Sequence, residues 1–151
     1  RGKDISKFMM YSKFDGYYAS IGSLDKYYKS SMDLLNKDIK ENLFGVKNRP
    51  IYTKVKNSAP VKYLDGSLVQ NSLIADGCVI EGIVENSILF RGVKVGKNTV
   101  IRNSIIMQDS FVGDNVVLNC VISDKNAVIK NGRCLSGHET HPFSIGKGAV
   151  I

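Results

Sequence analysis

Four side chains that could bind a metal ion or move a proton lie close together near the end of the chain. They are Cys134, His138, Glu139 and His141. Thiolate, imidazole and carboxylate groups are the usual ligands of zinc, but this spacing matches no common zinc motif, so we expect no metal site. Either histidine could instead serve as a general base for a hydroxyl or amine acceptor.

The charge distribution divides the chain in two. The net charge is +7, and residues 1–62 hold 13 basic against 6 acidic residues, whereas residues 63–151 hold 8 of each. A basic segment of this kind can meet nucleic acid, an acidic protein face or a phosphorylated small molecule. Because no aromatic motif is interleaved with the lysines, we expect no nucleic-acid partner.

Other features of the composition concern the compartment. The three cysteines cannot all pair with one another and form no Cys-x-x-Cys motif, which favours small structural thiols in a cytoplasmic protein. No 18-residue apolar run is present, and the first residues lack the apolar core of a signal peptide. We therefore expect no membrane partner.

A repeated turn organises the second half of the chain. It reads Asn71-Ser72-Leu73-Ile74 and returns at Asn86, Asn103 and Asn119 with spacings of 15, 17 and 16 residues. Regular recurrence of this kind predicts a repeat architecture. An antiparallel domain of short strands is the alternative, but ordinary hairpins need not keep such a period.

Within each period the aliphatic residues step by about six positions. The columns are Leu89, Val95 and Ile101, then Ile106, Val112 and Leu118, then Ile122, Ile129 and Leu135. Three short strands per coil, each with an inward aliphatic residue, predict a parallel β-helix of three-sided coils. Gly96, Gly113 and Gly146 follow inward residues, where a corner needs a small residue or a positive φ. Residues 137–142 break the period, so either a loop leaves the coil there or one face loses its apolar lining.

The segment before the repeat reads as a short α/β tail. We expect strands over 5–14 and 17–21, a helix over about 24–35 capped by Ser23, and a shorter helix from Asp38 to Phe44. The aromatic and methionine stripe of Tyr27, Tyr28 and Met32 is interpreted as core. The predicted organisation is a tail over 1–45, a linker over 46–63 and a β-helix over 64–151.

Several motifs along the chain resemble one enzyme family. Phe14-Asp15-Gly16-Tyr17-Tyr18-Ala19-Ser20-Ile21-Gly22-Ser23, Met32-Asp33-Leu34-Leu35, Arg49-Pro50-Ile51-Tyr52, Gly77-Cys78-Val79-Ile80-Glu81-Gly82 and Ser87-Ile88-Leu89-Phe90 resemble bacterial glucose-1-phosphate adenylyltransferase (ADP-glucose pyrophosphorylase). The resemblance implies a left-handed β-helix of hexapeptide repeats attached to a nucleotidyltransferase domain that makes ADP-glucose from ATP and glucose 1-phosphate for glycogen synthesis. This chain would be the C-terminal part, and Mg with ATP would bind in the catalytic domain, so we expect no cofactor in the fragment.

The resemblance breaks at Ser20, which stands where the family has an Asp that is a metal ligand of the catalytic centre. A hydroxyl is a poor replacement for a carboxylate on a divalent metal. This departure resembles the noncatalytic regulatory subunit of Gram-positive bacteria, which acts beside a catalytic subunit in a mixed tetramer. The fragment itself would then be no enzyme, and the full-length protein would be catalytically weak or inactive.

Two further expectations concern ligands and the alternative function. Family members respond to phosphorylated metabolites near the domain junction, so the resemblance makes Arg49, Lys54, Lys56 and Lys62 candidate effector-binding residues for allosteric control. The alternative function is a hexapeptide-repeat acyltransferase with His138 or His141 as its base.

Overall fold

The computed structural model describes residues 13–53 and 55–151, in which two helices precede fifteen short strands. The helices are α1 (Leu24–Asp33) and α2 (Lys37–Phe44). Sheet A, in spatial order, is β1 (Lys62–Tyr63), β4 (Val79–Ile80), β7 (Lys94–Val95), β10 (Phe111–Val112) and β13 (Val128–Ile129). Sheet B is β14 (Cys134–Ser136), β11 (Val117–Asn119), β8 (Val100–Arg102), β5 (Ile83–Glu85) and β2 (Leu68–Gln70). Sheet C is β15 (Phe143–Ile145), β12 (Val121–Ser123), β9 (Ile105–Ile106), β6 (Ile88–Leu89) and β3 (Leu73–Ile74).

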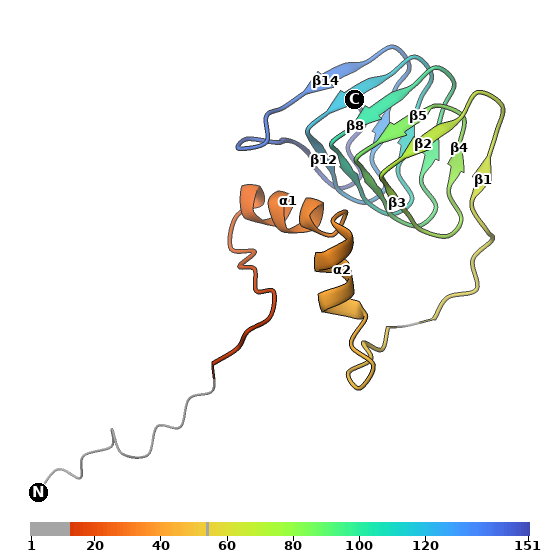
Figure 1. The fold of residues 1–151 in the computed structure, drawn as a ribbon. Helices are drawn as coiled ribbons and strands as arrows, with labels where there is room; N and C mark the ends of the chain where they lie inside the picture. Colours follow the sequence, from red (N-terminus) through yellow and green to blue (C-terminus); the bar gives the residue numbers. More distant parts are fainter. Residues whose placement is uncertain (1–12, 54) are drawn as a thin grey trace, which may run out of the picture.

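Each strand pairs in parallel with the equivalent strand of the next coil. In sheet B, for example, Val84 pairs with Ile101 and Leu118 pairs with Leu135. Successive coils thus contribute one strand to each of three sheets, which surround a common interior (Figure 1). The predicted parallel β-helix of three-sided coils is confirmed, and β1 starts it two residues before the predicted boundary at residue 64.

Alternate side chains of each strand point into the solenoid, as the pleat requires. The interior is a continuous stack of aliphatic side chains with little or no exposure: Ile80, Val84, Leu89, Val95, Ile101, Ile106, Val112, Leu118 and Ile129. Because no coil can bury its apolar side chains alone, stacking of neighbouring coils creates the core.

The fourth coil departs from the predicted columns. The sequence predicts Ile122 as the inward residue, but β12 pairs with β9 through Ile122 with Ile105 and Ser123 with Ile106. Ser123 therefore takes the inward position, and Ile122 packs outside the solenoid interior.

A one-residue shift explains this departure. Asn119 pairs with Arg102 in sheet B, so Cys120, with a φ of 52°, occupies the corner position that asparagine holds in the earlier coils. Val121 donates its N–H to Ser104 Oγ at 3.1 Å and thus stands where the repeat has serine. The expectation that Cys120 takes the serine position was wrong, because a 16-residue spacing meets coils that are 17 residues apart.

Corners of the solenoid use two different properties of small or turn-forming residues. Six asparagines have a positive φ, which this side chain tolerates better than most: Asn71, Asn86, Asn98, Asn103, Asn115 and Asn126. Gly96 has no positive φ, but a Cβ there would lie 2.7 Å from the carbonyl carbon of Gly113 in the next coil. Of the two predicted reasons for this glycine, close approach is the correct one.

The segment before the solenoid follows the prediction in part. Helix α1 forms with Ser23 at its N-cap, whereas α2 is capped by Asn36, whose Oδ1 accepts the Asp38 N–H at 2.9 Å. Asp38 is therefore the second residue of α2 rather than its cap. The predicted strand over 17–21 does not form, since no strand in the described part of the chain lies beside it. Residues 5–12 of the other predicted strand lie outside the described residues.

Residues 137–142 leave the coil as a loop between β14 and β15, which resolves the break in the period. His138 and His141 exchange backbone hydrogen bonds of 3.0 and 2.9 Å across this loop. Within the described ranges, neither helix has the length and apolar character needed to cross a membrane.

Candidate functional site

The principal site outside the solenoid interior is the junction where α1 lies on the outer face of sheet C (Figure 1). Tyr28 is only 4% exposed and packs against Ile105 and Ile122. Partly buried side chains surround these three residues: Tyr27, Met32, Phe90 and Met107. Residues four positions apart share one face of a helix, so the spacing of Tyr28 and Met32 directs both toward the sheet.

The Tyr28 hydroxyl fixes the helix to the solenoid by a specific bond. It donates to the Asn103 backbone oxygen at 2.6 Å. Burial raises the pKa of Tyr28 strongly, and the neighbouring Cys120 thiol raises it further through a hydrogen bond and its charge. The phenol therefore stays protonated and acts as a hydrogen-bond donor rather than as an acid or base at neutral pH.

A cavity of about 490 Å³ opens beside this bond. Its lining comes from α1, the asparagine corner and the 137–142 loop: Tyr28, Lys29, Met32, Asp33, Leu35, Asn71, Asn86, Asn103, Glu139 and Thr140. Asn71 Nδ2 donates to Asn86 Oδ1 at 2.8 Å, and Asn103 Nδ2 donates to Asn119 Oδ1 at 3.0 Å. These amides satisfy one another along the corner, so the geometry connects three elements and presents no nucleophile paired with a base.

The histidine loop places its reactive groups on the surface. Cys134, His138, Glu139 and His141 are all exposed. Thr140 Oγ1 lies 3.0 Å from His138 Nδ1 and 3.1 Å from His141 Nδ1. Over residues 13–53 and 55–151, the structure brings no three His, Cys, Asp or Glu side chains together for a metal ion. The loop geometry instead occupies one nitrogen of each imidazole with the threonine hydroxyl.

The candidate effector residues lie on different elements. Arg49 lines a cavity of about 670 Å³ with Phe14, Val46 and Ile51, among others. Lys62 is exposed on β1, in sheet A of the first coil, and Lys56 is exposed in the connection that precedes it. Lys54 falls outside the described residues. The effector assignment of these four residues therefore stays a prediction.

Ser20, the position at which the family motif has a metal-binding carboxylate, is exposed in the segment before α1. The nearest described acidic side chain in sequence, Asp25, lies in the first turn of that helix. An Asp25 hydrogen bond with the Ser23 side chain lowers the pKa of this carboxyl. Asp25 is thus engaged in the start of the helix, and the departure from the family motif at Ser20 stays a prediction about activity.

Sequence reasoning identified the aromatic stripe of α1 as a packing surface but not the surface that it meets. The link between Tyr28 and Asn103 spans 75 residues of sequence. A helical spacing of aromatic residues signals a buried face, yet nothing in that spacing names the solenoid corner as its partner.

Comparison with known proteins agrees with this architecture. Residues 60–141 match the family described as GlmU-like, C-terminal hexapeptide. "Glycogen biosynthesis protein GlgD" of Bacillus subtilis (strain 168) is 46% identical over 138 residues, covering 91% of this chain and 40% of that relative. The protein of the same name from Geobacillus stearothermophilus is 51% identical over 121 residues, covering 80% of this chain and 35% of the relative.

"Glucose-1-phosphate adenylyltransferase" of Bacillus mycoides (strain KBAB4) is 35% identical over 129 residues, covering 85% of this chain and 34% of that relative. The chain therefore spans at most 40% of the length of these relatives. These similarities confirm the resemblance to glucose-1-phosphate adenylyltransferases. Because the hexapeptide match covers more than half of the chain and includes the strands from β1 to β14, the chain belongs to the GlmU-like, C-terminal hexapeptide family.

Proposed function

We propose that this chain serves glycogen biosynthesis as the assembly and regulatory part of a noncatalytic subunit of glucose-1-phosphate adenylyltransferase. The observation that carries the proposal is the 46% identity to a glycogen biosynthesis protein across 91% of the chain, against 35% for an adenylyltransferase across 85%. In this proposal ATP and Mg bind to the catalytic partner, and the present chain changes the partner's behaviour through contact.

The geometry of the junction supports a role in contact. Tyr28 anchors α1 on sheet C through burial and a 2.6 Å hydrogen bond, so helix and solenoid can act as one rigid unit. A rigid unit is suited to transmit a change at one contact surface to another, because packed elements shift between discrete arrangements.

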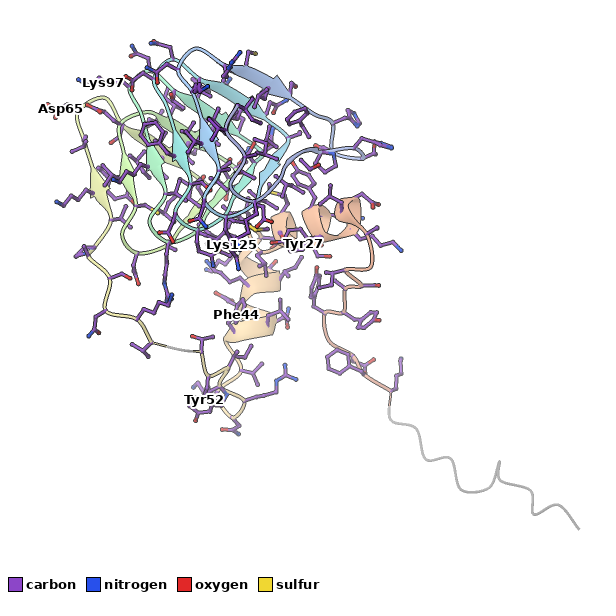
Figure 2. The ribbon with its side chains drawn as sticks, turned by 180° about the vertical axis from the view of Figure 1, so that it is seen from behind. Tyr27, Phe44, Tyr52, Asp65, Lys97 and Lys125 are labelled. Carbon is purple, nitrogen blue, oxygen red and sulfur yellow. The ribbon has the colours of Figure 1, made fainter. Side chains whose placement is uncertain are left out.

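The segments flanking the helices supply an apolar surface for such a contact. Phe14 is 62% exposed and Ile51 56% exposed, and both line the 670 Å³ cavity with Arg49. Phe44 and Tyr52 lie in the part of the molecule far from the solenoid (Figure 2). Exposed apolar groups gathered in this way are typical of a docking surface, and we assign this one to a nucleotidyltransferase domain.

The regulatory ligand in this proposal is a phosphorylated metabolite. Arg49 offers a planar guanidinium at the rim of an apolar cavity, which suits bidentate recognition of a phosphate group. Lys54, Lys56 and Lys62 are the accompanying candidates for charge neutralisation.

The test is reconstitution with a catalytic enzyme. The chain is mixed with the glucose-1-phosphate adenylyltransferase of Bacillus mycoides, and complex formation is measured by size-exclusion chromatography alongside ADP-glucose synthesis. We expect the two proteins to elute together and the enzyme's maximal rate or its KM for ATP to change. Separate elution with unchanged kinetics would refute the proposal, and acyl transfer from acyl-coenzyme A that is lost in His138→Ala would favour the acyltransferase alternative.

A further inference from the structure

We propose that the outer face of sheet B is a self-association surface that pairs two copies of this chain in antiparallel order. The inference deepens the proposed function, on which it rests for the expectation of an assembly. Sheet B lies on the side of the solenoid away from α1 and α2 (Figure 1). Its outward side chains therefore meet neither helix.

An aliphatic column runs along this face. Val69 and Val84 point inward, so their neighbours Leu68 and Ile83 point outward, and the column continues through Val100 and Val117. Leu68 is 53% and Val117 41% exposed. A contiguous row of half-exposed aliphatic side chains on consecutive strands is a candidate interaction surface.

The same solenoid shows what happens to such a column when a partner is present. On sheet C the equivalent outward residues Ile88, Ile105 and Ile122 are buried, and α1 packs on the last two of them. The column on sheet B lacks a helix of this kind in the described chain. A partner from outside can cover it in the same way.

A polar column beside the aliphatic one indicates which partner fits. It consists of Gln70, Glu85, Arg102 and Asn119, at the third position of each strand. Arg102 Nε lies 2.6 Å from Glu85 Oε2, with both side chains partly exposed. One acidic and one basic residue on adjacent strands make this column complementary to its own reverse.

This complementarity selects one register. A two-fold axis parallel to the strands and midway between β5 and β8 would place Glu85 of one copy opposite Arg102 of the other, twice. The same axis sets Ile83 opposite Val100 and Leu68 opposite Val117, so aliphatic residues meet aliphatic residues. A two-fold axis centred on β8 would instead set Arg102 against itself, which like-charge repulsion disfavours. An isologous contact of this kind requires the same patch on both copies, and sheet B offers it.

The experiment uses complementary charge reversals in the 151-residue chain, with sedimentation velocity as the readout. The wild-type chain is expected to dimerise. Glu85→Arg alone and Arg102→Glu alone each bring like charges together across the two-fold axis, which should weaken dimerisation at least about 100-fold. An equimolar mixture of the two variants restores both opposite-charge contacts, so we expect a heterodimer to form.

Restoration by mixing separates the contact between chains from the ion pair within one chain, because each variant retains two like charges at these positions. Far-UV circular dichroism verifies that both variants keep the solenoid. Val117→Lys provides a second variant on the aliphatic column, and Phe111→Lys, at a 43% exposed site on sheet A, is its matched control. We expect the first substitution to abolish the dimer and the second to leave it intact.

A monomeric wild-type chain, unchanged dimerisation of both charge variants, or a mixture that stays monomeric would each overturn the inference. Adding the catalytic enzyme distinguishes the other possible occupant of sheet B. If Glu85→Arg abolishes binding to that enzyme while wild-type chains do not pair with each other, the enzyme occupies this face and self-association is refuted. A chain that dimerises but leaves the enzyme's kinetics unchanged would refute only the proposed function.

Discussion

Replacing Tyr28 by alanine should release α1 from the solenoid without unfolding the solenoid. The side chain is 4% exposed, and its hydroxyl donates to Asn103 at 2.6 Å. Truncation of a buried aromatic side chain typically costs about 3–5 kcal/mol. The ten-residue α1 is too short to be stable alone in water, so an undocked α1 should melt.

Hydrogen exchange measured by mass spectrometry can follow this release locally. A loss of about 3 kcal/mol or more corresponds to at least a 100-fold faster exchange of the α1 amides. Amides of β8 and β9 should keep their protection, because their ladders involve only other strands. Tyr18→Ala, at an 82% exposed tyrosine, is the matched control and should change nothing.

The raised pKa of Tyr28 adds a pH dependence with a definite sign. Desolvation favours the neutral phenol in the docked state, so docking is fully stable below the ordinary tyrosine pKa of 10.0 and weakens as the pH rises above it. Tyr28→Phe should remove this alkaline sensitivity and lower the docking free energy by about 1–3 kcal/mol, since a buried carbonyl oxygen loses its donor. Unchanged α1 protection in Tyr28→Ala, or equal loss of protection in α1 and the strands, would refute the reasoning.

Two other predictions concern the solenoid interior and its thiols. Gly82→Ala should destabilise the chain by about 1–3 kcal/mol in thermal denaturation, because its Cβ would overlap a backbone carbonyl oxygen of the next coil, whereas Gly146→Ala, with open space around it, should be neutral. Equal melting temperatures for the two variants would contradict this account. Under native conditions a thiol reagent should modify exposed Cys134 quickly and buried Cys78 and Cys120 slowly, since exposure controls access and burial raises the pKa of Cys78. Rapid reaction of all three thiols in folded protein would show that the coils open readily.

The repeat made most of the solenoid predictable, because its period and its apolar step are set by the geometry of the coils themselves. Leu89, Val95 and Ile101 fall where their spacing places them, with exposures of at most 3%. Each of these assignments depends only on local alternation and on the next coil. Information of that range is present in a single sequence.

Contacts between different kinds of element were much less predictable. The apolar face of α1 could be recognised from its spacing, but its partner on sheet C could not, since docking of a helix on a sheet depends on which outward residues the corners present. The strand expected over 17–21 failed for a related reason: strand propensity without a neighbouring strand to pair with is insufficient. The effector residues and Ser20 lie beyond both kinds of inference, because their roles depend on surfaces contributed by other protein.

The one-residue shift in the fourth coil connects these two levels. If the spacing between Asn103 and Asn119 had been 17 residues, the isoleucine of the repeated phrase would have entered the interior. The shortened spacing places Ser123 inside and Ile122 outside, where Ile122 contacts the Tyr28 cluster. Burying an isoleucine side chain contributes about 1.5–3 kcal/mol wherever it is buried. The shift therefore transfers that stabilisation from the solenoid core to the docking of α1, and it brings Cys120 next to the Tyr28 hydroxyl.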